Sequence, residues 1–439
     1  MREPLRVGIA GLGTVGASVA RLMARNAEGL ALRAGRPMIL GAVCARDRSR
    51  DRGVDLSRAT WHADPLALAR DPNVDCVVEL IGGDEGPARA LVEAALGAGK
   101  HVVTANKALL AKHGMALARL AEERGVALAF EASAAGGVPV VKALREALAG
   151  NRVSRVSGIL NGTCNYILSR MEAEGLSFAA CLADAQRLGY AEADPTFDVE
   201  GFDTAHKLAI LTALAFGVAL DPDAIYVEGI SKITPLDLRM AAELGYRIKL
   251  LGVAERTPTG IEQRVHPTMV PRTSSLAQVM GVTNAVTIDA DAVGELSLIG
   301  PGAGGDATAS AVIADICDVA ADVVRPAFGI PADRLAAPER APMQRHEGGY
   351  YIRLSVFDRP GSAAGIATRM AQADISLESI IQHRARTADV DPTGRSGAPV
   401  PVVLITYATT EAAIREALAR IDADGHVAEP PQVIRIERE

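Results

Sequence analysis

Five acidic residues and a lysine lie within one stretch of the sequence, GYAEADPTFDVEGFDTAHK at 189–207: Glu192, Asp194, Asp198, Glu200, Asp203 and Lys207. Asp203 and Lys207 are four residues apart on a predicted helix, so they share one of its faces. An isolated pair of this kind is usually an exposed salt bridge. This helix continues almost wholly apolar, however, so we expect the pair to face an interior cleft. A partly buried lysine beside carboxylates can donate or accept a proton.

Two other side chains could take part in chemistry. Lys107, in TANK at 104–107, follows the fourth predicted strand, and ligands of open α/β sheets bind at the carboxyl ends of strands. The alternative is a surface lysine at a helix start. Cys164, in NGTCNYIL at 161–168, is a candidate nucleophile of the aldehyde-oxidising kind. We see no base near it in the sequence and favour a packing role for Cys164.

A glycine-rich turn, RVGIAGLGTVG at 6–16, joins an apolar strand to an apolar-periodic helix. Gly11 permits the tight turn, Gly13 lets the backbone approach a pyrophosphate, and Gly16 allows the helix to pack against the strand. The helix N-terminus offers free N–H groups to a phosphate. This placement predicts dinucleotide binding, where a lone glycine turn would not.

The end of the second predicted strand bears on the choice of dinucleotide. Arg46 follows Val43-Cys44-Ala45 where NAD-specific sites usually carry an acid. A guanidinium there pairs with a 2′-phosphate, so we favour NADP and keep NAD as possible. Asp47 becomes the acid if the strand register slips by one residue, and a solvated charge run is the plainest alternative.

The supporting elements change character along the chain. Up to residue 131, short apolar runs alternate with helical patterns, which predicts parallel strands with right-handed helical crossovers. The predicted strands are 6–10, 38–44, 74–80, 101–104 and 126–131, with helices at 88–98 and 108–124. After about residue 137, we predict helices at 140–149, 162–174, 177–188 and 202–216, and strands at 153–160, 246–254, 261–267 and 284–299. A glycine-rich break at 300–307 then leads into a helix that reaches residue 324.

The last ninety residues form a pattern of their own. Residues 336–349 are rich in Pro, Gly and charge and are typical of a linker. Strands at 350–357, 375–384, 400–407 and 431–437, with helices at 361–373 and 410–422, give a βαββαβ order. That order predicts a ferredoxin-like arrangement.

Composition limits the class of protein. The chain has 439 residues, which suggests about three domains. A net charge of −7 and few aromatic residues argue against a nucleic-acid-binding surface. The five cysteines are widely spaced without a CxxC pair, so we expect neither disulfides nor a cysteine-rich zinc site. We also expect no signal peptide and no membrane span, and hence a cytoplasmic protein.

Taken in order, six motifs resemble homoserine dehydrogenase over about residues 5–325: GLGTVG, TANKALL, EASAAGGVP, NGTCNYIL, the acidic stretch ending in HKLAIL, and GPGAGGDATASAV. The tail, with FDRPG at 357–361, resembles an ACT regulatory domain. The resemblance implies a Rossmann NAD(P)-binding domain at 1–137, completed by a helix at 305–330. It further implies an α+β catalytic and dimerisation domain at 138–304, a linker at 331–349 and an ACT domain at 350–439.

By this resemblance, the enzyme interconverts L-homoserine and L-aspartate 4-semialdehyde with NAD(P), in the pathway to threonine and methionine. Lys207 matches the family's proton-transferring lysine, and Lys107 matches the second lysine near substrate and nicotinamide. Glu192 and Asp203 match substrate-binding acids, with Asp198 nearby. Phe197 replaces a smaller residue that is common in the family, which predicts a reshaped pocket edge.

The resemblance also implies further ligand contacts. Positions where the family touches the cofactor are Thr14, Val15, Thr104, Gly189 and Gly302. Glu131, with the backbone carbonyls of Ala134, Gly136 and Val138, matches a monovalent cation site, usually for sodium. The implied effector is threonine, bound between paired ACT domains, in a homodimer or homotetramer. Two alternatives remain at this point: a tail used only for dimerisation, and a sensor that binds nucleotide and amino acid without turnover.

Overall fold

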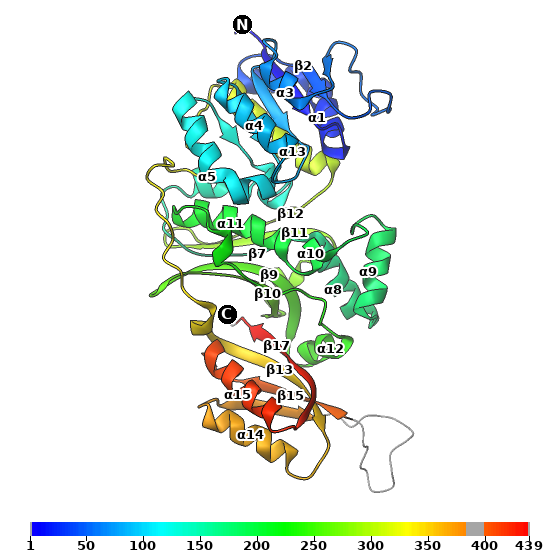
Figure 1. The fold of residues 1–439 in the computed structure, drawn as a ribbon, viewed down its shortest axis with the longest axis vertical. Coiled ribbons are helices and arrows are strands. Elements are labelled where there is room, and N and C mark those ends of the chain that lie inside the picture. The colour runs from blue at the N-terminus through cyan, green and yellow to red at the C-terminus, as the bar shows by residue number, and fades with distance from the viewer. Residues whose placement is uncertain (1, 383–398, 438–439) are drawn as a thin grey trace.

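The computed structural model describes residues 2–382 and 399–437. Three units follow one another along the long axis of the molecule, from the N-terminal unit through a central unit to a C-terminal unit (Figure 1). Within the described residues, no helix is long and apolar enough to cross a membrane.

The N-terminal unit is built on a six-stranded, wholly parallel sheet in the order β3-β2-β1-β4-β5-β6. This is the strand order of a doubly wound dinucleotide-binding fold, as the alternating pattern predicted. The strands are β1 (Leu5–Ala10), β2 (Met38–Cys44), β3 (Thr60–His62), β4 (Cys76–Glu79), β5 (His101–Thr104) and β6 (Leu128–Ala129). The helices are α1 (Thr14–Arg25), α2 (Ala27–Ala34), α3 (Pro65–Arg70), α4 (Pro87–Gly97) and α5 (Lys107–Arg124).

A helix from much later in the chain, α13 (Gly305–Ala320), completes this unit by packing against α1. A Cβ on Gly305 would lie 2.8 Å from Ser18 Oγ, so only glycine allows this approach. The predicted helix ends at 324 and 330 are wrong, because Asp322 takes a positive φ of 60° and stops the helix after Ala320. The short edge strand β3 and the helices α2 and α3 were not predicted.

The central unit carries an antiparallel sheet in the order β12-β11-β7-β9-β10. Its strands are β7 (Val153–Ile159), β9 (Tyr246–Thr257), β10 (Gly260–Pro271), β11 (Thr283–Ala290) and β12 (Gly294–Pro301), with β8 (Tyr226–Val227) paired to β10. Its helices are α6 (Ala132–Ala135), α7 (Val140–Lys142), α8 (Gly162–Glu174), α9 (Phe178–Arg187), α10 (Thr196–Val199), α11 (Phe202–Phe216) and α12 (Pro235–Glu243).

Two expectations for the central unit need correction. The strand predicted at 284–299 is a hairpin of β11 and β12, because Gly294 turns the chain with a positive φ of 77°. The helix predicted at 140–149 is one short α-helical segment followed by a π-helical turn at Ala143–Ala147. The long helix α11, predicted at 202–216, runs over those residues and is buried along most of its length.

The C-terminal unit has the predicted βαββαβ order, with its strands arranged as β17-β13-β15-β14. Its elements are β13 (Glu347–Phe357), α14 (Ser362–Gln372), β14 (Leu377–Gln382), β15 (Pro399–Thr406), α15 (Glu411–Ala423) and β17 (Val427–Ile436), with a short β16 (Thr409–Thr410) beside β13. β13 begins three residues before the predicted strand, within the segment predicted as linker. Both helices cover one face of this sheet (Figure 1).

The C-terminal unit is joined to the central one by a shared sheet. β17 pairs in parallel with β10 through Thr268 with Arg435 and Met269 with Ile436, so one eleven-stranded sheet runs through both units. This pairing was not predicted from the sequence.

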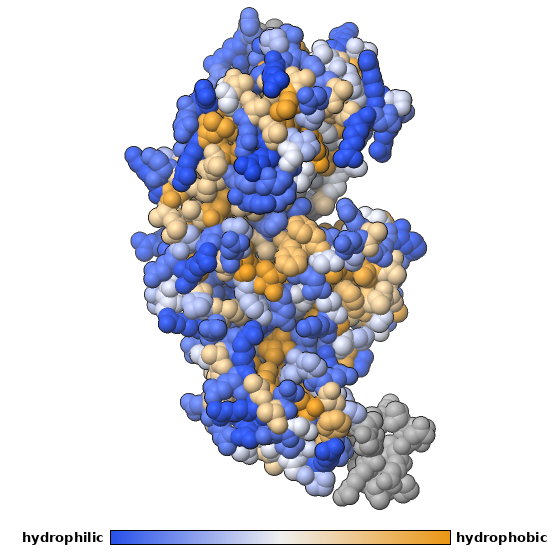
Figure 2. All heavy atoms as spheres, viewed as in Figure 1, coloured by the Kyte–Doolittle hydropathy of each residue, from blue (hydrophilic) through white to orange (hydrophobic). Residues whose placement is uncertain are grey.

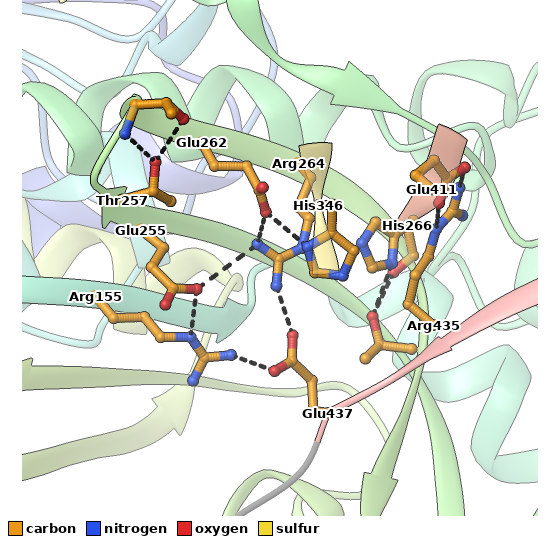
Figure 3. Close-up of polar contacts among 12 residues, drawn as sticks. Arg155, Glu255, Thr257, Glu262, Arg264, His266, His346, Glu411, Arg435 and Glu437 are labelled. Carbon is orange, nitrogen blue, oxygen red and sulfur yellow. Dashed lines mark hydrogen bonds and ion pairs between the residues drawn. The ribbon is translucent and has the colours of Figure 1, made fainter. Parts of the chain in front are cut away.

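Charged side chains reinforce the same junction (Figure 3). Glu437 lies 2.8 Å from Arg264 of β10 and 2.8 Å from Arg155 of β7. Glu262 pairs with Arg264 and also lies 3.0 Å from Nδ1 of His346. Arg264 is 1% exposed, and a buried guanidinium of this kind is tolerated only when it is paired.

Candidate active site

The glycine turn has the geometry that a pyrophosphate requires. Gly11 has a φ of 97°, and a Cβ there would overlap the Leu80 carbonyl. A Cβ on Gly16 would overlap the Gly11 carbonyl, whereas Gly13 faces open space. α1 starts at Thr14 with no acidic residue in its first turn and no side-chain cap. Its first N–H groups, including that of Val15, therefore stay available to an anion.

A cleft of about 540 Å³ opens beside this turn, at the carboxyl ends of β1, β2 and β4. Arg46, Arg50 and Arg52 line it with the glycine turn. Arg52 donates from Nε to the Leu12 carbonyl, 3.1 Å away, and so ties the loop after β2 to the glycine turn. The Asp47 carboxylate accepts hydrogen bonds from the backbone N–H and hydroxyl of Ser49.

Arg46 therefore differs from its acidic neighbour. Arg46 is exposed, and among the described residues no hydrogen bond or ion pair engages its guanidinium. Asp47 is held within its own loop. Both side chains line the cleft, but Oδ1 of Asp47 is engaged by Ser49, whereas within the described part of the chain the Arg46 guanidinium extends from the strand end without such a bond.

A buried acid fixes the loops that present Lys107. Glu79, at the end of β4, accepts backbone N–H groups of Ile81 and Gly82 through Oε1. Its Oε2 accepts the Thr104 hydroxyl at 2.6 Å. Asn106 donates to the Gly83 carbonyl and caps α5 by accepting from the N–H of Leu109. Lys107 starts that helix, so this network sets its direction.

The acid–lysine pair predicted from the sequence lies in the interior, as expected. Lys207 Nζ donates to Asp203 Oδ2 at 2.7 Å and to the Leu160 carbonyl at 2.6 Å. Lys107 Nζ lies 3.2 Å from Asp203 Oδ1. Burial by itself raises the pKa of Asp203, but the charges of Lys207 and Lys107 outweigh it and hold that pKa well below its usual range. One ionised carboxylate is thus shared by two lysines.

Of the other acids in the stretch, the structure brings Asp198 into the cluster and leaves Glu192 outside it. Asn161 Nδ2 donates to Asp198 Oδ1 at 2.9 Å and to Asp203 Oδ2 at 2.8 Å. Burial raises the pKa of Asp198, and the charge of Asp203 raises it further. Glu192 is exposed, near the turn at Gly189, with its backbone carbonyl bound by the Gln186 side chain.

Cys164 is a packing residue in this structure. Its side chain is completely buried, and Sγ donates to the Asp198 carbonyl at 3.2 Å. Burial raises the pKa of this thiol well above its usual value. A buried, protonated thiol is a poor nucleophile, so the aldehyde-oxidising alternative loses its main residue.

The glycine loop before α13 meets the same cluster. Asn284 donates to the Leu160 carbonyl at 3.0 Å, and that oxygen also accepts from Lys207. Gly302 lies directly against the Asn284 amide, so a Cβ on Gly302 would overlap it. The Gly302 carbonyl in turn leaves no room for a Cβ on Gly136. This loop therefore links the nucleotide unit to the end of β7, where the Leu160 carbonyl accepts a hydrogen bond from Lys207.

Aromatic rings border the opening toward the nucleotide unit. Phe197 is 42% exposed, and its ring centre lies 6.0 Å from Lys107 Nζ and 5.3 Å from the ring of His206. Phe202 stacks beside it. Apolar residues gather on this part of the surface, over α10 and α11 (Figure 2). Phe197 thus lies beside Lys107, and the reshaped pocket edge expected from this residue stays a prediction.

The oxygen-rich loop around Glu131 is the place where the sequence predicts a cation site. Glu131 is 2% exposed and accepts the N–H groups of Val141 and Lys142. Burial, with Asp315 nearby, raises the pKa of Glu131 to about 7. Within the described residues, Oδ1 of the buried Asp315 accepts no hydrogen bond, although Lys142 Nζ lies 3.8 Å from it. Buried carboxylate and carbonyl oxygens are donors that suit a hard cation, but no three His, Cys, Asp or Glu side chains in the described residues group as metal ligands.

Several residues of this site were not predicted from the sequence. They are amides and a strand-end acid: Asn161, Asn284, Asn106 and Glu79, together with Arg52. A glutamate that ends an otherwise apolar strand was a usable signal for Glu79. The amides offered none, because their partners are distant in the sequence.

Comparison with known proteins gives concordant results. A homoserine dehydrogenase family model matches residues 139–317, and a model of the homoserine dehydrogenase NAD-binding domain matches residues 11–131. The homoserine dehydrogenase of Pseudomonas aeruginosa is 46% identical, with 99% of each chain covered.

Solved structures agree with that comparison. A homoserine dehydrogenase from Thiobacillus denitrificans has a TM-score of 0.91 at 44% identity, covering 99% of this chain and 98% of its own. A hyperthermophilic archaeal homoserine dehydrogenase in complex with NADPH has a TM-score of 0.60 at 26% identity, covering 72% of this chain and 97% of its own.

Proposed function

This chain belongs to the homoserine dehydrogenase family of NAD(P)-dependent oxidoreductases, and on that premise we propose that Lys207 moves the proton in its reaction. The observation that carries the proposal is the position of Lys207 Nζ, between Asp203 and the Leu160 carbonyl. The nucleotide supplies the hydride acceptor or donor at its nicotinamide ring. The protein must therefore supply the proton transfer and the alignment.

In the oxidation direction, neutral Lys207 takes the proton from the homoserine hydroxyl as hydride leaves the same carbon. In the reduction direction, protonated Lys207 gives its proton to the developing alkoxide of aspartate 4-semialdehyde. Lys107 adds positive charge near the aldehyde oxygen. Proton transfer by a positioned side chain is general acid–base catalysis.

Asp203 and Asp198 suit a substrate that carries an α-ammonium group. Both carboxylates are held at fixed positions by Asn161, and Asp203 is ionised beside two lysines. Glu192 belongs to this proposal only if the exposed loop that carries it closes over bound substrate. A sensor that only bound nucleotide and amino acid, without turnover, would not need a lysine among these acids.

For the cofactor, we favour NADP, with NAD as the second possibility. The support is the exposed guanidinium of Arg46 at the cleft and the containment of Asp47 within its own loop. A related archaeal enzyme has been solved with NADPH. Thr14, Val15, Gly189 and Gly302 remain proposed cofactor contacts. The Thr104 hydroxyl is already bound to Glu79, so a contact there would use the backbone.

A monovalent cation, most simply Na⁺, is proposed at Glu131 with the carbonyls of Ala134, Gly136 and Val138. Its contribution is charge compensation for buried carboxylates and stiffening of the loop that carries Gly136. No chemical step depends on it.

The C-terminal unit is proposed to be an ACT domain that binds threonine as a feedback effector. Its ferredoxin-like strand order and the turn at Asp358–Gly361 support this proposal. A homodimer or homotetramer would pair such units.

The five free cysteines suit the reducing cytoplasm.

The direct test is consumption of NADPH and of NADH with aspartate 4-semialdehyde, with and without threonine. We expect rapid oxidation of NADPH, slower oxidation of NADH, and inhibition by threonine. Equal rates with both nucleotides would remove the role given to Arg46. Absence of any heat with threonine in isothermal titration would leave the C-terminal unit as a dimerisation module.

A further inference from the structure

Asn161 occupies the point where β7 ends and α8 begins, and both ends of its side chain are used. It is 5% exposed. Its Oδ1 accepts the N–H of Cys164 at 2.8 Å, which caps α8. Its Nδ2 has two hydrogens, and the two acceptors in reach are Asp198 and Asp203. The cap and the two carboxylate bonds together fix the orientation of the amide.

The residue before it contributes through its backbone. The Leu160 carbonyl accepts from Lys207, and Lys207 also donates to the Asp203 oxygen that Asn161 holds. An ammonium group has three N–H donors. One N–H of Lys207 is directed to the Leu160 carbonyl and a second to the Asp203 carboxylate, which Asn161 positions. The third N–H is left for a substrate oxygen.

An amide is suited to this position for an electrostatic reason. Asp203 is buried, Asp198 is half-buried, and the two lie close enough to share one NH₂ group, so their charges repel each other. The amide satisfies one oxygen of each without adding charge. When ionised, the two carboxylates then balance Lys107 and Lys207. A lysine or arginine here would add a third cation, and an aspartate a third anion.

We propose that Asn161 is a positioning residue for proton transfer: its amide bridges Asp198 and Asp203 and thereby holds Lys207 in the direction of the reacting hydroxyl. The inference rests on the proposed role of Lys207. The Asn161 side chain then has two functions: helix capping through Oδ1 and carboxylate bridging through Nδ2.

Two variants distinguish these functions. Asn161→Ser and Asn161→Asp both keep an oxygen that can cap α8. Asn161→Ser has no group long enough to bridge the two carboxylates. Asn161→Asp has the same size as the native residue but has lost both donors and gained a charge. Ser177→Ala, which removes the cap of α9 away from the site, is the control for loss of a helix cap.

We expect Asn161→Ser to lower kcat by about 10- to 100-fold, with NADPH affinity and the urea midpoint close to wild type. We expect Asn161→Asp to move the pH profile of homoserine oxidation to higher pH by about one unit, because an added negative charge favours the protonated form of a neighbouring amine. Ser177→Ala should lower stability and leave the profile in place.

Wild-type kcat in Asn161→Ser, or an unshifted profile in Asn161→Asp, would overturn the proposal and leave Asn161 as a helix cap only. The variant Lys207→Ala, measured alongside, separates the proton-transfer role of Lys207 from the positioning role of Asn161. Full turnover in Lys207→Ala would refute the proton-transfer role itself. Loss of turnover there with wild-type behaviour of Asn161→Ser would refute only the inference about Asn161.

Discussion

Lys107 Nζ lies 3.2 Å from Asp203 Oδ1, and this ion pair joins the first residue of α5 in the nucleotide unit to α11 in the central unit. The charges that we propose to bind substrate are therefore complete only when the two units are held together. Asp203 is the partner that both lysines share, which makes it the residue whose removal should most affect substrate binding.

Asp203→Ala should raise the KM for homoserine by about 10- to 100-fold, the range for hydrogen bonds to charged groups. The physical reason is loss of the carboxylate that is proposed to bind the substrate ammonium group. Asp194→Ala is the matched control, because Asp194 is exposed and its carboxylate accepts hydrogen bonds from the backbone N–H and the side chain of Thr196. Steady-state kinetics check this, and an unchanged KM would remove Asp203 from substrate binding.

Arg46→Ala should reduce the preference for NADPH over NADH by about 10-fold, since a charge-assisted contact to the 2′-phosphate would be lost. Arg48 is the natural comparison, because it lies 5.9 Å from the ring centre of Trp61 and does not line the cleft. The ratio of kcat/KM for the two nucleotides measures the effect. An equal change of this ratio in Arg48→Ala would indicate that the loss of any positive charge near the cleft has the same effect, without a specific contact of Arg46.

Gly302→Ala should lower kcat by about 100-fold, the order expected for a displacement of about 1 Å at a reacting group. The new Cβ would push Asn284 away from the Leu160 carbonyl, which holds Lys207. Gly150→Ala adds the same atom where the backbone faces open space. If Gly302→Ala kept full activity, the loop before α13 would not be coupled to the site.

The buried Lys249 should make stability depend on pH. It is 1% exposed and donates to Asn165 Oδ1, and burial lowers its pKa from 10.5 to about 8. Between about pH 8 and 10.5, the unfolded chain then binds the proton that the folded chain has lost. Stability therefore rises with pH across this window.

The contribution of Lys249 is up to about 3 kcal/mol over that interval. Lys249→Met removes this titration, so the difference in unfolding free energy between wild type and variant should change in favour of wild type as the pH rises. Urea unfolding at several pH values between 7 and 10 measures it. Parallel curves for the two proteins would show that Lys249 keeps its proton on folding.

The sequence predicted those parts of the site that lie on one local pattern. Gly11, Gly13 and Gly16 follow a strand and open a helix, and their spacing together with this placement indicates the dinucleotide turn. Asp203 and Lys207 share a helix face, so their pairing follows from helical geometry. The ferredoxin-like order of the tail follows from alternating patterns in the same way.

What the sequence did not predict depends on contacts between distant segments. Asn284 reaches the Leu160 carbonyl because β11 pairs with β7 in a register that sets Ala285 opposite Ile159. No local signal contains that register. The pairing of β17 with β10 and the ion pairs of Glu437 at the same junction also join segments that are distant in the sequence. The early end of α13 was missed because Asp322 adopts a backbone conformation that is rare for residues other than glycine.

Turnover of the Lys207→Ala variant shows whether Lys207 transfers the proton. NADPH oxidation with aspartate 4-semialdehyde should fall by about 10²- to 10⁴-fold, while NADPH binding, followed by its fluorescence, stays close to wild type. A variant that binds NADPH normally and turns over at a near-normal rate would contradict the account.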